Sequence, residues 1–310
     1  MRYGEKIKIH APATVANMVC GFDILGFAVA APYDEMILQL RKEPGISITH
    51  TDEYGLSTNP DDNVAGVTLQ AMLSELTIPV GFDVTIHKHI KPGSGLGSSA
   101  ASAAGAVVAA NYLLGELFSN EDLVQFAMHG EKLASGVKHA DNITPCIYGG
   151  VTLIRSIFPL DIIPIKSPKL YVTIVHPQIE VKTADARSIL KEQVYLKDAI
   201  KQWGNIAGLV SGLLQEDYAL ISRSLEDVLI EPVRSILIPG FHDVKEKAKA
   251  NGALGGGISG SGPSIFMLSR TLETAQLIEV EMKKVYEQMN LQYYTYVTTV
   301  SEGGVQFITE

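Results

Sequence analysis

A two-domain α+β protein is the fold class that this sequence predicts, and three observations support it. Segments with the period-two pattern of strands and segments with the apolar spacing of helices alternate loosely along the chain. The length of 310 residues suits two domains or one large one with a sizeable core. A proline-spaced strip at Phe158–Pro168 separates the halves. We therefore predict domains at residues 1–163 and 164–310, each with strands and helices in layers.

The chain before residue 150 contains patterns for three strands and three helices. Strands are expected at Glu5–Ala13, Val29–Lys42 and Phe82–Ile90, and helices at Val64–Leu76, Ser99–Leu114 and from Ser119 to about Ala134, where Ser119 and Asp122 resemble a capping box. A turn at Asn59–Asn63 precedes the first of these helices.

The C-terminal half contains three strand patterns, five helix patterns and a glycine cluster. After a strand at Val151–Ile157, we predict strands at Leu170–Pro177, Ile265–Leu268 and Tyr293–Val300, helices at Ala184–Leu190, Leu196–Leu214, Asp217–Asp227, Asp243–Asn251 and Thr274–Met289, and a glycine-rich loop at Gly252–Ser264.

Composition excludes several classes of protein. Hydrophobic residues make up 46% of the chain and charged residues 19%, as in ordinary globular proteins. The net charge of −9 argues against nucleic acid or an anionic membrane as a partner. No secretory signal and no apolar run long enough for a membrane-spanning helix is visible. Two cysteines offer neither a disulfide framework nor zinc spacing, so we expect a reduced, cytoplasmic protein.

The segment Lys91–Ala110, KPGSGLGSSAASAAGAVVAA, carries the clearest functional signal. Glycines at every second position run into Ser98 and Ser99 and then into strong helix formers. A glycine loop that leads into a helix N-terminus is a natural phosphate site. The spacing does not match a P-loop or a Rossmann dinucleotide motif. Tight helix packing is the alternative explanation for such a composition.

Glu131 lies on the apolar face of the helix that follows. A carboxylate among packed apolar residues is costly unless something pairs with it. Either a lysine or arginine neutralises it, or it binds a metal ion beside the phosphate loop.

Three separated motifs identify a family. PGSGLGSSAAS resembles the nucleotide-phosphate motif of the GHMP kinases (galactokinase, homoserine kinase, mevalonate kinase and phosphomevalonate kinase), and GISGSGPSIF resembles their C-terminal glycine motif. APATVANMVCGFDILGFA resembles their first motif in the form that homoserine kinases carry. KHADNITPCIYGG, VKTADAR and IEPVR are also similar to that branch, and the resemblance runs from about Ile7 to Ile308.

The resemblance implies a fold and a reaction. The expected fold has an N-terminal α+β domain with a left-handed β-α-β unit and a ferredoxin-like C-terminal domain. The implied reaction converts ATP and L-homoserine to O-phospho-L-homoserine and ADP, a step towards threonine. Enzymes of this family are usually cytoplasmic homodimers that require Mg²⁺.

The resemblance also implies roles for individual residues. Phosphate and nucleotide contacts are expected from Asn63, Pro92, Gly93, Ser94, Gly95, Leu96, Gly97, Ser98, Ser99, Ala100, Thr183 and Ser261. By family position, Ser98 and Glu131 hold Mg²⁺ through oxygen atoms. The amino-acid substrate is expected to meet Asn17, Asp23, His139, Asn142, Arg187 and Arg234, with the arginines on its carboxylate. For Asn63 a plain Asx turn, and for His139 a core position, are equal alternatives.

One position departs from part of the family. Galactokinase- and mevalonate-kinase-type enzymes place an aspartate base where this chain has Asn142, although Asp141 is adjacent. If Asn142 faces the hydroxyl, it orients the substrate and no side chain acts as a base.

Two other functions compete with this interpretation. Another small-molecule GHMP kinase, of the mevalonate or diphosphocytidyl-methylerythritol type, does not need the arginine pair. A non-catalytic relative should have lost the loop glycines or the metal carboxylate, and this chain has kept both.

Overall fold

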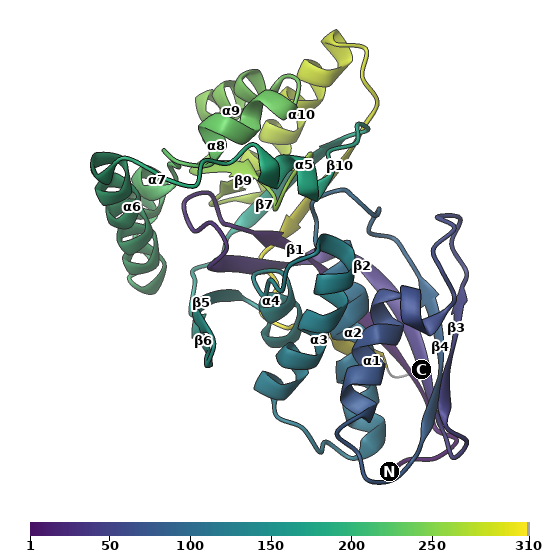
Figure 1. Cartoon of the computed structure of the whole chain (residues 1–310). Coiled ribbons are helices and arrows are strands. Elements are labelled where there is room, and N and C mark those ends of the chain that lie inside the picture. Colours follow the sequence, from purple (N-terminus) through teal and green to yellow (C-terminus); the bar gives the residue numbers. More distant parts are fainter. Residues whose placement is uncertain (309–310) are drawn as a thin grey trace.

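The computed structural model describes residues 1–308 as two sheets with helices, stacked one above the other in Figure 1. The first sheet has seven strands, in the order β11-β1-β2-β4-β3, with β5 paired to β2 and β6 paired to β5. Their bounds are β1 Lys6–Ala16, β2 Leu25–Arg41, β3 Gly45–His50, β4 Gly81–His87, β5 Val151–Ile157, β6 Leu160–Ile165 and β11 Gln306–Ile308. β3 and β4 pair in parallel, and α1 (Val64–Leu73) connects them.

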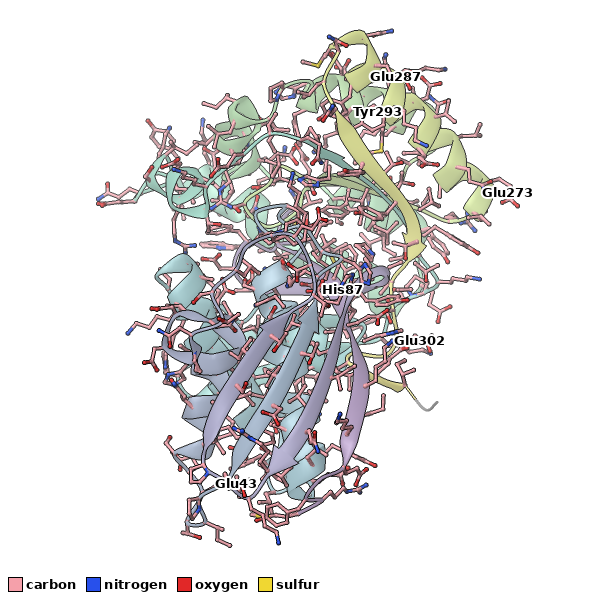
Figure 2. The ribbon with its side chains drawn as sticks, turned by 90° about the vertical axis from the view of Figure 1, so that its right-hand side faces the viewer. Glu43, His87, Glu273, Glu287, Tyr293 and Glu302 are labelled. Carbon is pink, nitrogen blue, oxygen red and sulfur yellow. The ribbon has the colours of Figure 1, made fainter. Side chains whose placement is uncertain are left out.

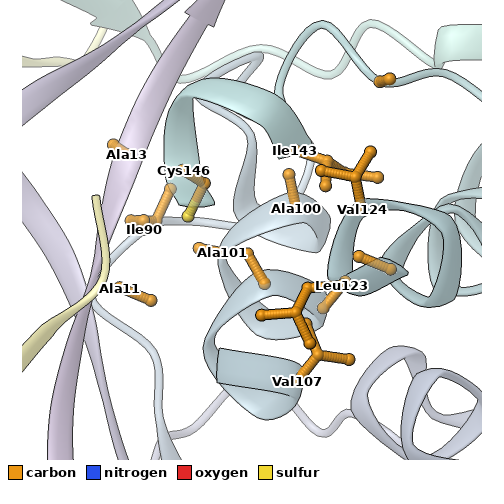
Figure 3. Packing of buried hydrophobic residues seen from close by; sticks show 14 of the residues in the cluster. Ala11, Ala13, Ile90, Ala100, Ala101, Val107, Leu123, Val124, Ile143 and Cys146 are labelled. Atoms are coloured by element: carbon orange, nitrogen blue, oxygen red, sulfur yellow. The ribbon is translucent and has the colours of Figure 1, made fainter. Parts of the chain in front are cut away.

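Helices cover one face of this sheet. Besides α1 they are α2 (Ser98–Leu114), α3 (Asn120–Ser135) and α4 (Ile143–Tyr148). Helix α2 lies at the centre of this half, where Ala100, Ala101 and Val107 are fully buried. Figure 3 shows α2 between the strands and the neighbouring helices. Alanine is the best helix former and its small side chain permits close packing on both sides. This packing fixes the N-terminus of α2.

The second sheet has the antiparallel order β10-β7-β9-β8, which is the 4-1-3-2 order of a ferredoxin-like domain. Its strands are β7 Tyr171–Pro177, β8 Gly255–Ile258, β9 Ile265–Ser269 and β10 Tyr293–Thr299. The helices of this half are α5 Thr183–Ser188, α6 Leu196–Leu214, α7 Tyr218–Ser224, α8 Glu231–Arg234, α9 Phe241–Ala250 and α10 Leu272–Gln288.

The end of the chain returns to the first sheet. β11 pairs with β1 after β10 has completed the second sheet, and β6 continues to Ile165. The division at residues 163 and 164 stays a prediction. Figure 2 shows the uncovered face of the first sheet, with Glu43 at one end and His87 at the end nearer the second sheet. The glycine loop that follows β4 therefore emerges between the two sheets.

Several elements differ from the sequence-based expectation. Neither β3, α4, α8 nor β11 was expected, because each is too short for its periodicity to show. β6 forms within the proline-spaced strip, where Pro164 is tolerated because the strand pairs only with β5. The expected loop at Gly252–Ser264 contains β8, whose glycines are buried. A Cβ on Gly256 would clash with the Phe266 carbonyl oxygen, so close backbone approach requires glycine there.

Candidate active site

A cavity of about 370 Å³ lies between the two sheets and collects most of the predicted residues. Its lining includes Asn17, Asp23, Asn63, Pro92, Gly93, Gly95, Gly97, Ser98, Ser99, Glu131, His139, Asn142, Thr183, Arg187, Arg234 and Ser261. Three predicted nucleotide contacts are not part of the lining: the side chains of Ser94, Leu96 and Ala100 are at most 1% exposed. These three side chains pack the loop from behind.

The glycine loop presents unpaired amides to the cavity. Gly93, Gly95 and Gly97 have φ values of +75°, +80° and +67°, which side-chain-bearing residues rarely adopt. Gly97 is also the N-cap of α2. Within residues 1–308, the amides of Gly95, Gly97 and Ser99 donate to no protein acceptor. Free N–H groups at the positive end of a 17-residue helix form an anion site.

The second glycine cluster holds this loop from the other sheet. Ser259 Oγ donates to the Gly95 carbonyl oxygen at 2.7 Å, and the Ser264 amide donates to the Ser94 carbonyl oxygen at 3.2 Å. A Cβ on Gly95 would lie 2.6 Å from the Ser259 carbonyl oxygen. The two glycine-rich motifs therefore contact each other directly, which explains why both need glycine.

Glu131 is paired with a serine of the loop and not with a cation. Ser99 Oγ donates to Glu131 Oε2 at 2.8 Å, whereas Ser98 Oγ donates to the Ile90 carbonyl oxygen at 2.8 Å. The geometry thus brings Ser99 rather than the expected Ser98 to Glu131. Burial raises the pKa of Glu131, and the hydrogen bond from Ser99 opposes this. A carboxylate and a hydroxyl beside a phosphate site are donors that a hard divalent ion prefers.

A buried ion pair lies under the first turn of α2. The Lys88 ammonium contacts Asp34 and donates to the Ser98 carbonyl oxygen at 2.7 Å and to Ser102 Oγ at 2.8 Å. Asp34 Oδ1 accepts from the amides of His89 and Ile90, each at 2.8 Å. Lys88 also lines the cavity. The pair fixes the loop to β2, and because Asp34 balances the charge of Lys88 it adds no net charge to the anion site.

Asp23 and Arg187 also line the cavity and contact each other. Arg187 Nη2 lies 2.6 Å from Asp23 Oδ2, and both side chains are about one-third exposed. Asn17 holds Asp23 in place, because its Nδ2 donates to the Gly260 carbonyl oxygen and its Oδ1 accepts from the Asp23 amide. Asn17 and Asp23 have positive φ values of 72° and 58°. The anion Asp23 thus lies on a strained loop that other contacts hold, and the cation Arg187 reaches it from α5.

Arg234 and His139 lie close to the Asp23–Arg187 pair. Arg234 is 4% exposed, and its Nε donates to the Ala186 carbonyl oxygen at 2.9 Å. His139 Nδ1 lies 3.8 Å from Asp23 Oδ1, and its buried Nε2 has no protein partner within the described residues. Burial lowers the pKa of His139, and the two nearby arginines add to this effect while Asp23 opposes it. These surroundings favour the neutral form of the imidazole.

Asp141 and Asn142 both line the cavity. Asn142 Oδ1 accepts a 2.8 Å hydrogen bond from Thr14 Oγ1, which fixes its amide. Asp141 is buried, and this burial, followed by the charges of Asp23 and Glu131, raises its pKa to about 7. The fixed amide fits an orienting role, and the adjacent aspartate is poised near neutrality.

Two predicted nucleotide contacts have protein partners of their own. Asn63 Oδ1 caps α1 by accepting from the amides of Ala65 and Gly66, and its Nδ2 donates to the Ser57 carbonyl oxygen at 2.6 Å. The Asx-type cap, which the sequence left open, is thus formed. Thr183 Oγ1 lies 3.2 Å from Ser261 Oγ across the cavity mouth.

Sequence reasoning did not single out Lys88, although a signal was available. Phe82, Val84, Ile86 and Lys88 alternate along one strand, so the lysine falls on the apolar face. The same argument identified Glu131. The apolar wall made by Leu56, Val64 and Ile86 carried no such signal, because apolar residues are expected in any core.

Comparison with known proteins agrees with this architecture. The model of the GHMP kinase N-terminal domain matches residues 63–150, and that of the C-terminal domain matches residues 209–288. The chain belongs to the GHMP kinase family. The two-domain fold expected from the resemblance is therefore confirmed.

Homoserine kinases match this chain over nearly its whole length. The chain is 46% identical to the homoserine kinase of Chlorobium phaeobacteroides (strain BS1), over 96% of this chain and 98% of the relative. The crystal structure of homoserine kinase from Cytophaga hutchinsonii is 48% identical, with a TM-score of 0.95 over 99% of both chains. Within the family, the chain belongs with the homoserine kinases. The mevalonate kinase of L. major, 17% identical with a TM-score of 0.73 over 97% of both chains, shares the fold.

Proposed function

We propose that this enzyme transfers the γ-phosphoryl group of ATP to the side-chain hydroxyl of L-homoserine, giving O-phospho-L-homoserine and ADP. The observation that carries the proposal is that two different sets of groups line one cavity. Unpaired loop amides and the Ser99–Glu131 pair suit a polyphosphate, and the Asp23–Arg187 pair suits an amino acid. The high identity to homoserine kinases over nearly the whole chain supports the same substrate.

Phosphoryl transfer needs positioning and charge neutralisation more than covalent chemistry. In our proposal the unpaired amides of Gly95, Gly97 and Ser99 hold the phosphates, and Lys88 supports the helix turn beneath them. Ser99 and Glu131 hold Mg²⁺, which when bound neutralises phosphate charge. Within residues 1–308 no cluster of three or more metal-ligating side chains occurs. The hydroxyl of Ser99 and the single carboxylate of Glu131 nevertheless fit Mg²⁺, which usually takes one or two carboxylates and completes its coordination shell with phosphate and water.

The substrate end suits an amino acid. An α-ammonium and an α-carboxylate share one carbon atom, so they need an anion and a cation at contact distance, which Asp23 and Arg187 provide. Arg234, held by the Ala186 carbonyl oxygen, adds a second positive charge. A diphosphocytidyl alcohol offers no ammonium group for Asp23. This chemistry therefore favours homoserine over the alternative GHMP substrates.

We propose that Asn142 orients the reacting hydroxyl and that no side chain acts as its base. The Thr14 hydrogen bond fixes the Asn142 amide at the cavity wall. In a loose transition state the proton leaves late and moves to the phosphoryl group. Asn142→Ala should then lower kcat with little change in the pH dependence. A pH–rate profile that shows one essential base near neutrality, and loses it in Asp141→Asn, would contradict this role.

A coupled ADP-release assay tests the substrate. With Mg·ATP, activity is expected with L-homoserine and much less with serine, threonine or mevalonate. The hydroxyl groups of serine and threonine lie at a different distance from the ammonium and carboxylate groups that anchor the substrate. Mevalonate has no ammonium group. Turnover confined to mevalonate, or none with any of the four, would overturn the proposal. ATP binding measured by calorimetry separates a lost nucleotide site from a wrong second substrate.

We also propose a homodimer in the cytoplasm, as the family resemblance implies. Cys20 and Cys146 are free and buried, which suits a reducing compartment. Within the described residues no helix is both long and apolar enough to cross a bilayer.

A further inference from the structure

The buried face of helix α6 includes a polar side chain, Gln202, that contacts two separate segments of the chain. Gln202 is 4% exposed and does not line the cavity. Its Nε2 donates to the Cys20 carbonyl oxygen at 2.8 Å and to Asp227 Oδ1 at 3.0 Å. Its Oε1 accepts from the Val228 amide at 3.0 Å. Both N–H groups and the carbonyl oxygen of this amide are therefore bonded, so Gln202 ties the two segments to each other.

The first segment is the loop Asn17–Asp23, between β1 and β2. Four of its non-glycine residues, Asp23 among them, have positive φ. Such backbone is strained and persists only where surrounding contacts hold it. Gln202 supplies the contact at Cys20, whose carbonyl oxygen accepts from no other donor among the described residues. The position of Asp23 therefore depends in part on Gln202.

The second segment runs from Asp227 to Arg234 and ends in α8. The Asp227 carboxylate accepts from the amides of residues 229–231 at 2.9, 3.1 and 2.8 Å, and these bonds fix the turn that leads to Arg234. Gln202 adds a hydrogen bond to Asp227 and another from the next amide. The position of Arg234 therefore also depends on Gln202.

The two segments and α5 meet again at one aromatic ring. Phe22 precedes Asp23 in the loop, and its ring centre lies 4.9 Å from the guanidinium carbon of Arg234 and 5.6 Å from that of Arg187. A guanidinium group over an aromatic face is attracted to it. A displacement of the loop would therefore move both the anion Asp23 and the ring against which the two arginines rest.

We propose that Gln202 is a positioning residue of the amino-acid site, which sets the spacing between Asp23 and Arg234 without touching the substrate. This inference rests on the proposed function. An amino acid carries its ammonium and carboxylate groups at a fixed separation, so a change in the spacing of their partners weakens binding. The glycine loop is held instead by Ser259, which donates to Gly95. The nucleotide site should therefore be independent of Gln202.

A comparison of KM values is the first test. Gln202→Leu keeps a similar size but removes all three hydrogen bonds, so it should raise KM for homoserine about 10-fold or more and change KM for ATP less than about twofold. Gln202→Asn keeps an amide but is one methylene shorter. It should give a smaller rise in the same direction, and it provides the test if Gln202→Leu does not fold. Leu209→Ala, at a fully buried apolar position of the same helix, is the control for lost stability and should leave both KM values unchanged.

A double-mutant cycle tests whether Gln202 acts through Arg234. Gln202→Leu, Arg234→Lys and the combined variant are compared by kcat/KM for homoserine. If Gln202 acts by placing the guanidinium group, the loss in the combined variant should be at least about 5-fold smaller than the product of the single losses. Losses that multiply would show that Gln202 does not act through Arg234.

Thiol labelling gives a readout that needs no substrate. Cys20 and Cys146 are both free and buried, so their rates of reaction with iodoacetamide, followed by peptide mass spectrometry, report local opening at each site in the same sample. Gln202→Leu should label Cys20 about 10-fold or more faster than the wild-type protein, with no change at Cys146. A general loss of stability would instead accelerate both thiols, as Leu209→Ala may be used to calibrate.

Three results would overturn the inference: equal rises in KM for ATP and homoserine in Gln202→Leu, the same KM change in Leu209→Ala, or Cys20 labelling at the wild-type rate in Gln202→Leu. Failure of the proposed function gives a different result, because the wild-type protein would then not phosphorylate homoserine. Selective labelling of Cys20 in Gln202→Leu would in that case still support the link between the two segments, and its absence would refute it.

Discussion

Ser99 Oγ donates a 2.8 Å hydrogen bond to Glu131 Oε2, which joins the first turn of α2 to α3 beside the unpaired amides of the glycine loop. Glu131 has no lysine or arginine partner among the described residues. Its burial is costly unless a bound cation compensates for it. This one contact connects the sequence pattern on α3 with the anion site.

Glu131→Gln should lower kcat/KM for Mg·ATP about 100-fold or more, because it removes the only charge of the proposed Mg²⁺ site while keeping the side-chain size. KM for homoserine should change little. Burial raises the pKa of Glu131, so the wild-type demand for Mg²⁺ should increase as pH falls, at a higher pH than for an exposed carboxyl group. Glu121→Gln, on an exposed part of the same helix, is the control. Steady-state kinetics at several Mg²⁺ concentrations test this prediction. An equal loss of kcat/KM in Glu131→Gln and Glu121→Gln would show that Glu131 does not hold the metal ion.

Gly97→Ala and Gly93→Ala form a matched pair. Both positions have positive φ, so both substitutions incur about 1 kcal/mol of backbone strain. At Gly97 the new Cβ would also clash with Thr14 Oγ1, whereas at Gly93 nothing lies within 4 Å. Gly97→Ala should therefore lower the free energy of unfolding by about 1–3 kcal/mol more than Gly93→Ala. Urea unfolding measures this difference, and equal values would show that the packing around Gly97 yields without cost.

Asp141 should make the protein less stable as pH rises. Its pKa is about 7 in the folded state and near 3.8 when unfolded, so the folded state binds more protons between these values. The stabilising contribution is complete below about pH 4 and is lost as pH rises through about 7. Asp141→Asn should remove this slope, and the exposed Asp243→Asn should keep it. Urea unfolding from about pH 5 to 8 provides the test, and parallel curves for wild type and Asp141→Asn would refute it.

Arg187→Lys should raise KM for homoserine about 10- to 100-fold, because a lysine keeps the charge but loses the paired donors that bind a carboxylate. KM for ATP should not change, since Arg187 pairs with Asp23 and not with a residue of the glycine loop or with Glu131. Arg223→Lys on the exposed side of α7 serves as the control. An increase in KM for ATP instead would assign Arg187 to the nucleotide end.

Asp34→Asn should lower the free energy of unfolding by about 3–5 kcal/mol, because it leaves the buried Lys88 ammonium without its counter-charge. The amide oxygen of the new side chain would still accept from the His89 and Ile90 amides, so the double variant Asp34→Asn/Lys88→Met should recover much of the loss. Neutralising the exposed Glu216 should cost less than about 1 kcal/mol. Thermal and urea unfolding compare the three. A double variant less stable than Asp34→Asn would show that Lys88 contributes through more than its charge.

The sequence by itself determined the long elements and the chemistry of the phosphate site. Helix α2 follows from its alanine run and the anion site from the alternating glycines, because local propensity and backbone freedom act over a few residues. Glu131 was found because a charge on an apolar face is unexpected at any position. The roles carried over from the family, such as Ser98 on the metal, rested on motif position alone.

Only the tertiary structure decided which groups meet. That Ser99 rather than Ser98 contacts Glu131 and that Asp23 pairs with Arg187 depend on distances between side chains that the sequence pattern does not encode. Burial, which raises the pKa of Asp141, and the pairing of β11 with β1 are likewise set by packing. Local patterns encode the elements and their faces, whereas the distances between side chains on different elements follow from how the whole core packs.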